Sequence, residues 1–246
     1  MSDPAGTSIP DWFCSTMDGH LIGPQQRVQG GPTVLLPMGM AARGKLWTDR
    51  GIRALRIGFI GGSQALRARV LETASDWCSG TCLTMSGEDT AGRAHIRVSF
   101  EQGRGSWSYI GTDCLGIQAT QATMNLGWVQ DNTPEEGFAS VVLHEFGHAL
   151  GLLHEHNHPD ANIQWDVAAV TADLSGPPNF WDEETIRSNV FARYDAASVI
   201  TTPFDQVSNM IYPIREGWTL NRKAFMPSPR ISAGDRATIQ RLYPPR

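Results

Sequence analysis

The chain has little of what would direct a protein to a membrane or to nucleic acid. No apolar run approaches the roughly 18 residues needed to cross a bilayer. Its 20 Lys and Arg residues are outnumbered by 25 Asp and Glu residues, which gives a formal net charge of -5. Surfaces that bind nucleic acid or anionic lipid need clustered positive charge, so the composition argues against both.

The N-terminal sequence lacks the features of a secretory leader. Residues 1–16, "MSDPAGTSIPDWFCST", have no basic start and no apolar segment. We therefore expect a protein that stays in the cytoplasm, leaves the cell by another route, or has a leader that is missing from this sequence.

Cysteine is scarce, and none of the four residues stands in a Cys-x-x-Cys pair. That argues against a zinc finger and against a thioredoxin-like motif. Cys78 and Cys82 in "CSGTC" are close enough to close a small disulfide loop in an oxidising compartment. Two free thiols at the end of a helix are an equal alternative.

The order of the predicted elements favours an α+β fold with two subdomains. Residues 1–45 are rich in Gly, Pro, Ser and Thr without a clear period, which predicts an irregular N-terminal arm. Residues 46–246 then form the folded domain, with strands and one helix before a mainly helical second half and a break near residues 151–154. We expect strands at 54–61, 95–103, 105–111 and 122–129, and helices capped by Ser63, Thr133, Asp166, Asp182 and Ser232.

Two predicted elements concern function, a helix that begins near Thr133 and the strand before it. Thr133, Pro134 and Glu136 predict a capping box with proline in the first helical position, for a helix that ends at Gly151. The strand before it, within 122–129, is flanked by a Gly/Gln-rich stretch and is predicted to lie at the edge of the sheet.

The predicted helix carries a metal-binding pattern. His144 and His148 are four residues apart, which places both imidazoles on one helical face. Glu145 stands beside the first histidine, where its carboxylate can reach a metal-bound water. This is the H-E-x-x-H arrangement of two zinc ligands and a general base.

A catalytic zinc needs a third protein ligand and one open position. Gly151 allows a sharp turn after His148, so His154 can return to the same metal. The alternative, in which these histidines are surface or core residues without a metal, is disfavoured by the complete pattern H-E-x-x-H-x-x-G-x-x-H. His156 and His158 fall outside the pattern, and we expect them to line the cleft rim rather than to form a second metal site.

Residues 144–154 resemble the signature of the metzincin zinc peptidases, which also have a methionine turn beneath the metal. "SNMIY" supplies Met210 and resembles the astacin turn, and Glu155 after the third histidine is also astacin-like. By this resemblance Tyr212 approaches the zinc and stabilises the oxyanion. Leu152 departs from the astacin pattern and "MIYP" resembles the matrixin turn equally, so the family within the clan stays open.

The resemblance implies a metzincin-type domain with a mixed twisted sheet and the active-site helix in its first subdomain, followed by a helical and irregular second subdomain. It implies a zinc endopeptidase with a protein or peptide substrate, and it suggests secretion. We expect a monomer in which the substrate pairs with the edge strand through Met124, Asn125, Leu126 and Gly127. The alternative function is a zinc-binding recognition module or toxin-like protein with little proteolytic activity.

Basic residues after the methionine turn bear on specificity. In the clan this region forms the pocket for the residue after the cut, so Arg215, Arg222 and Lys223 suggest a preference for an acidic side chain. The alternative is that all three are solvated loop charges.

Cys14 in the N-terminal arm suggests a latent form. Its thiolate could fill the open zinc position, and Asp11 or Asp18 could do so with a carboxylate. The alternative is an arm that merely packs on the surface. If the arm is a latency segment, we predict that its truncation accelerates peptide cleavage and that Cys14 binds zinc in the full chain. Equal activity of full-length and truncated protein would contradict latency.

Overall fold

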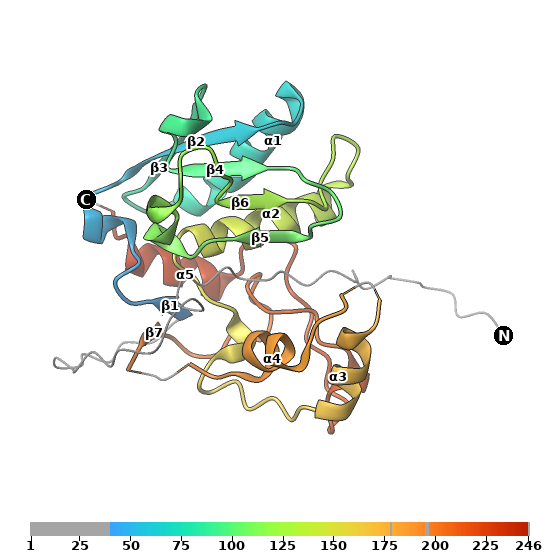
Figure 1. Ribbon diagram of the computed structural model, residues 1–246. Coiled ribbons are helices and arrows are strands. Elements are labelled where there is room, and N and C mark those ends of the chain that lie inside the picture. The colour runs from blue at the N-terminus through green and yellow to red at the C-terminus, as the bar shows by residue number, and fades with distance from the viewer. Residues whose placement is uncertain (1–39, 178, 195–196, 246) are drawn as a thin grey trace.

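The computed structural model describes residues 40–177, 179–194 and 197–245 (Figure 1). Cys14, Asp11 and Asp18 lie outside these residues. Within the segment expected to be irregular, Met40–Ala42 form strand β1, which is buried and pairs with β7 (Val199–Thr201) in a two-stranded antiparallel sheet.

The main sheet has five strands in the order β3-β2-β4-β6-β5, of which only β5 runs antiparallel to its neighbour. The four expected strands coincide with β2, β4, β5 and β6. The sequence did not predict β3, because its residues "TMSGE" lack an alternating apolar pattern. The strands span Ala54–Ile60 (β2), Thr84–Glu88 (β3), Ile96–Ser99 (β4), Ser106–Ser108 (β5) and Met124–Leu126 (β6).

The prediction that residues 124–127 form an edge strand is wrong. Strand β6 pairs with β4 on one side and with β5 on the other, and β5 is the edge strand. Met124 and Leu126 are buried in the core, as expected for a central strand whose apolar side chains pack under helices. The Gly/Gln-rich flank marks a loop before the strand, not its place in the sheet.

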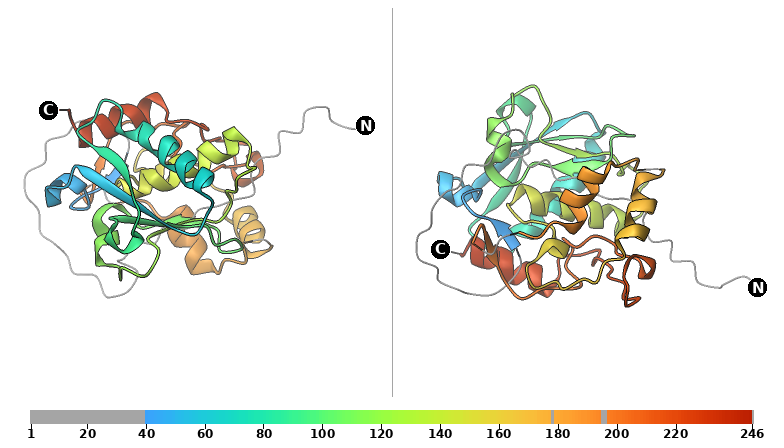
Figure 2. Two further views of the ribbon diagram at one scale, coloured as in Figure 1. Left: turned by 90° about the horizontal axis from the view of Figure 1, so that it is seen from above. Right: turned by 60° about the horizontal axis from the view of Figure 1, so that its bottom comes forward.

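Helices cover one face of this sheet. Helix α1 (Gln64–Ser75) and helix α2 (Glu135–Ala149) pack on it and on each other, and their apolar side chains share one core with those of β2, β4 and β6. Helix α5 (Ala233–Leu242) comes from the end of the chain and lies beside the end of α1 (Figure 2), where Arg236 and Asp76 form an ion pair at 2.9 Å.

The predicted helix caps are partly correct. Ser63 caps α1 and Ser232 caps α5 in a capping box with Asp235, as expected. The capping box on α2 is wrong: Pro134 is the N-cap, without a side-chain bond, and the Thr133 hydroxyl accepts from the Gln130 amide in the preceding turn. Proline has no N–H, so the start of α2 has one fewer unpaired donor.

The second half of the chain builds a smaller core below the sheet. Helices α3 (Val167–Ser175) and α4 (Glu183–Ile186), the latter continued by a π turn over Arg187–Phe191, pack there with a 3-10 turn at Glu155–Asn157. Both helices begin at the expected caps, Asp166 and Asp182.

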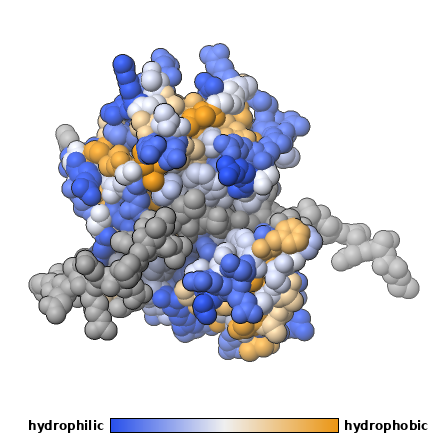
Figure 3. Space-filling model, viewed as in Figure 1, coloured by the Kyte–Doolittle hydropathy of each residue, from blue (hydrophilic) through white to orange (hydrophobic). Residues whose placement is uncertain are grey.

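The described cysteines are free thiols, so the disulfide between Cys78 and Cys82 is not formed. Burial raises the pKa of Cys78 to about 11 and that of Cys114 to about 12, which keeps both protonated. No helix among the described residues is long and apolar enough to cross a membrane. On the face shown in Figure 3, hydrophobic side chains form small patches among hydrophilic ones.

A buried carboxylate connects α5 to the turn at residues 208–210. Asp235 accepts from the Ser208 hydroxyl at 2.6 Å, from the Asn209 amide at 2.8 Å and from the Ser232 amide at 3.0 Å. Burial raises the pKa of Asp235, while these bonds act in the opposite direction. The turn is therefore held by a group that cannot be removed without leaving three buried donors unpaired.

We predict that Asp235→Ala lowers the free energy of unfolding by about 3 kcal/mol, because buried donors without acceptors each cost about 1–3 kcal/mol. Asp166→Ala is the matched control, since among the described residues Asp166 accepts only the Ala169 amide, at the start of α3. That loss should be about 1 kcal/mol. Urea unfolding measures both, and equal losses would refute the central role of Asp235.

Candidate metal centre

Helix α2 and the turn after it bring three histidines together. His144 and His148 lie on consecutive turns of α2, and Gly151 reverses the chain beyond it with φ 98°. Strand β1 then fixes the returning segment: the Ala42 amide donates to Gly151 O at 2.9 Å and the Leu153 amide to Met40 O at 2.8 Å. His154 follows at the position that faces the two helical histidines.

The separation of the imidazole nitrogens suits a metal ion. His148 Nε2 lies 3.2 Å from His144 Nε2 and 3.1 Å from His154 Nε2, and all three ligand atoms lie within 4.8 Å of one another. Two nitrogens bound to one tetrahedral zinc at about 2.0–2.1 Å would be about 3.3 Å apart. The three predicted ligands therefore fit a single zinc ion.

Backbone carbonyls orient two of the rings. His144 Nδ1 bonds to Asn209 O at 2.8 Å, and His148 Nδ1 bonds to Leu152 O at 2.9 Å. A carbonyl oxygen only accepts, so each Nδ1 carries the proton and each Nε2 presents a lone pair to the site.

Burial also keeps these rings neutral. It lowers the pKa of His144 to about 4 and the pKa of both His148 and His154 well below the usual value. A neutral imidazole is the form that binds a metal, so at neutral pH no proton has to be displaced from these nitrogens.

Met210 lies directly beneath the centre. A Cβ placed on Gly147, between the two helical histidines, would overlap Met210 Sδ and lie 3.0 Å from Met210 Cε. Only glycine at this position lets the sulfur reach the helix backbone. The Glu155 amide donates to Met210 O at 3.0 Å, which ties the same turn to the residue after His154.

Glu145 is buried, at 1% exposure, and borders a cavity of ≈ 30 Å³ together with His144 and Tyr212. A volume of this size has room for one or two water molecules. The remaining lining residues are mostly apolar: Trp128, Ser140, Val141, Asn209, Ile211, Pro213 and Pro227. A carboxylate thus lies beside a space that a reacting water can occupy.

The family model described as Astacin, a family of peptidases, matches residues 42–243. The chain belongs to the astacin family. That decides between the astacin and matrixin resemblances and confirms the metzincin-like α+β fold.

Relatives of this astacin include proteins of the sea urchin Strongylocentrotus purpuratus. The chain is 27% identical to Protein SpAN over 146 residues, which covers 57% of this chain and 20% of that protein. It is 34% identical to a bone morphogenetic protein 1 homolog over 118 residues, which covers 47% of this chain and 17% of the relative. The chain spans about a fifth of the length of these curated relatives.

Solved structures also match this astacin. Myroilysin superposes with a TM-score of 0.80 at 35% identity, over 85% of this chain and 100% of that one. High choriolytic enzyme 1, a hatching enzyme zinc-protease from Oryzias latipes, has a TM-score of 0.55 at 17% identity, over 80% of this chain and 92% of the other. The latter likeness shows a shared fold.

Tyr212 of this astacin is buried against two histidines. Its ring centroid lies 4.3 Å from that of His154 and 4.3 Å from that of His156, with the second pair stacked at 29°. The side chain is 2% exposed and also borders the cavity beside Glu145. Its predicted role at the oxyanion is therefore compatible with its place.

The prediction that His156 and His158 line the cleft rim is wrong. Both are buried, at 2% and 0% exposure. The 3-10 turn at 155–157 directs them inward, where His156 Nε2 bonds to Asn189 O at 2.8 Å and His158 Nδ1 accepts from the Asp160 amide at 3.0 Å. Among the described residues, the group that could hold a metal contains neither.

The basic residues after the turn do not line the cavity of this astacin. Arg215 lies 3.9 Å from Asp173, and Lys223 Nζ lies 4.7 Å from the centroid of the Phe225 ring. Arg222 is exposed. The structure therefore favours the alternative of solvated loop charges over an acid-selective pocket.

Several functional groups were not identified from the sequence. The carbonyls of Asn209 and Leu152 carry no side-chain signal, because any residue has a carbonyl. Gly147 does carry one, since glycine inside a helix is unfavourable and usually has a packing reason.

Glu155, which the sequence did identify, is buried. It accepts from the Asp205 amide at 2.9 Å, and burial, with the charges of Asp235 and Asp205, raises its pKa to about 8.

We predict that Gly147→Ala lowers both zinc affinity and stability, although Gly→Ala in a helix normally stabilises by about 1 kcal/mol. The added methyl group displaces Met210 and, with it, the Asn209 carbonyl that orients His144. The double variant Gly147→Ala, Met210→Ala makes room for the methyl group and should recover part of the zinc affinity. Zinc titration against a chelating indicator measures this, and the absence of coupling would contradict the contact.

Proposed function

We propose that this astacin is a zinc endopeptidase that hydrolyses peptide bonds with a water molecule. The observation that carries the proposal is the convergence of three neutral imidazoles, two of them buried and the third, His144, half-buried, beside a buried carboxylate and a cavity with room for water. Zinc bound by His144, His148 and His154 would supply a Lewis acid for the scissile carbonyl and lower the pKa of water.

Glu145 acts as the general base. Glu145 and His144 line the same cavity. The carboxylate therefore takes a proton from the attacking water and delivers it to the leaving amine. Tyr212, which packs against His154 and His156, provides its hydroxyl to the developing oxyanion. These roles follow from position and chemical type.

The substrate binds along the free edge of β5. An extended peptide there continues the sheet by backbone hydrogen bonds. Among the described strands, β5 is the one beside α2 that has one unpaired side. This assignment replaces the predicted pairing with residues 124–127, which are internal to the sheet.

The cavity next to Glu145 favours an uncharged residue after the cut. Val141, Ile211, Pro213 and Pro227 supply apolar walls. A carboxylate would enter this space without a basic partner among the lining residues, at a desolvation cost.

A recognition module without proteolytic activity is the competing function. Such a protein would need the histidines to hold zinc but would have no use for a buried carboxylate beside a water-sized cavity. Digestion of a peptide library with and without a chelator separates the two functions. Cleavage that stops on metal removal supports the enzyme.

Latency through Cys14 is part of the proposal. Support comes from the chemistry of a thiolate, which can occupy the open position of a three-histidine zinc site. We propose further that the enzyme acts as a monomer on protein or peptide substrates.

We predict that Glu145→Gln lowers kcat by about 10²–10⁴-fold while zinc stays bound, because the amide keeps the shape of the side chain but cannot accept a proton. Casein digestion and zinc content measured on the same sample test this. Glu136→Gln, on an exposed residue in the first turn of α2, is the control and should leave kcat unchanged. Near-normal cleavage by Glu145→Gln would exclude it as the base.

A further inference from the structure

Strand β5 is short for a strand that binds an extended substrate peptide, as the proposed function requires. It has three residues, and in the part of the chain that the structure describes it pairs only with β6: Ser106 with Leu126, Trp107 with Asn125 and Ser108 with Met124. A peptide that pairs with its free edge needs this strand in a fixed position. Some interaction besides three ladder pairs must therefore supply the rigidity.

The segment that leads into β5, which we call the 101–105 connection, is not held by packing. Glu101, Gln102, Gly103 and Arg104 are exposed. On the outer face of the sheet the connection borders a hollow of ≈ 610 Å³, lined among others by Trp107 and Asn125. Apolar burial thus contributes little to its position.

The ion pair within the connection does not fix it either. Glu101 and Arg104 lie 2.9 Å apart, but their side chains are 57% and 73% exposed. Exposed pairs of this kind stabilise by about 0–1 kcal/mol at most. The restraint has to come from elsewhere.

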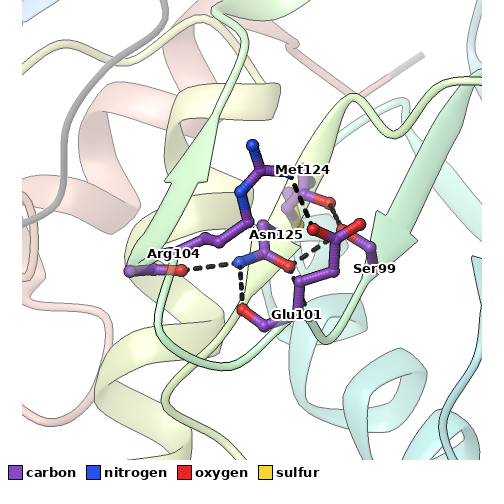
Figure 4. Close-up of polar contacts among 6 residues, drawn as sticks. Ser99, Glu101, Arg104, Met124 and Asn125 are labelled. Carbon is purple, nitrogen blue, oxygen red and sulfur yellow. Dashed lines mark hydrogen bonds and ion pairs between the residues drawn. The ribbon is translucent and has the colours of Figure 1, made fainter.

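Asn125 provides it. Its side chain is 1% exposed and bonds to both ends of the 101–105 connection (Figure 4). Nδ2 donates to Glu101 O at 3.0 Å and to Gly105 O at 2.6 Å, while Oδ1 accepts from the Glu101 amide and from the Ser99 hydroxyl, both at 2.8 Å.

These bonds saturate the amide. An asparagine side chain has two N–H donors and two principal acceptor positions, and all four are in use. Two carbonyls face the nitrogen and two donors face the oxygen, so the amide has one orientation. A carboxylate of the same shape could satisfy Glu101 N–H and Ser99 but would repel both carbonyls.

Gly127, directly after β6, makes a second contact with the connection. A Cβ there would overlap Gly105 O and lie 2.7 Å from Glu101 O. The same two carbonyls that Asn125 binds therefore run directly against the backbone at Gly127. The connection is fitted to the surface of β6 at two adjacent points.

We propose that Asn125 is a positioning residue for substrate binding, which holds the 101–105 connection and thereby the edge strand β5 where the peptide pairs. The proposal rests on the proposed function, since it assigns a role within that substrate site. Asn125 does not border the cavity beside Glu145, so it acts on binding along the strand and not on the reacting atoms.

The test compares two substrates of the zinc-loaded, full-length protein. One is a long peptide that extends along β5, and the other is its truncated form with a single residue ahead of the scissile bond. For Asn125→Asp we expect KM for the long peptide to rise about tenfold with kcat changed less than about twofold, and kcat/KM for the short peptide to stay within about twofold. Amide exchange at residues 106–108 should accelerate.

Two further variants complete the design. Gly127→Ala keeps the asparagine but pushes the connection away from β6, because its Cβ would overlap the two carbonyls and lie 2.9 Å from Asn125 Nδ2. It should also raise KM for the long peptide, so it decides the matter if Asn125→Asp does not fold. Gln102→Ala, on an exposed side chain in the same connection, is the matched control and should leave KM and kcat unchanged for both peptides.

Other results would overturn the proposal in distinguishable ways. Unchanged KM for the long peptide in both Asn125→Asp and Gly127→Ala rejects the positioning role. An equal loss for both peptides, with less bound zinc, assigns Asn125 to general stability instead. Wild-type protein that cleaves neither peptide rejects the proposed function itself, and the role of Asn125 with it.

Discussion

The turn at residues 208–210 is the contact on which the rest of the centre depends. Its Asn209 carbonyl accepts the Nδ1 hydrogen bond of His144, and its Met210 side chain packs against the glycine between the helical histidines. Asp235 in turn holds Ser208 and the Asn209 amide from α5. Helix α2 and the end of the chain therefore meet at one turn, and that turn sets the ring orientation on which metal binding depends.

Burial has two consequences at this centre. It lowers the pKa of the histidines, which favours the neutral ligand, and it raises the pKa of the neighbouring Glu155. Both effects have the same origin, because the charged form of any group loses hydration in the interior. The environment thus reduces net charge around the site before a metal binds.

Residue spacing predicted the chemical groups of the site better than it predicted how the surrounding segments pack. His144, Glu145, His148 and His154 follow from helical geometry and one glycine turn, which are local properties. The place of β6 in the sheet and the burial of His156 depend on which segments pack against them, and no short stretch of sequence encodes that. The carbonyls that orient the rings could not be predicted for the same reason, because every residue has a carbonyl and the fold decides which ones face the histidines.

Strand β1, at the start of the described chain, supports the metal centre. Met40–Ala42 bond to residues 151–153, the segment that delivers His154, and pair with β7 on the other side. A polypeptide that began after Ala42 would keep every residue of the zinc motif yet lose the strand that holds its third histidine in place. We therefore expect the smallest unit that holds the metal centre together to be larger than the motif and to begin no later than Met40.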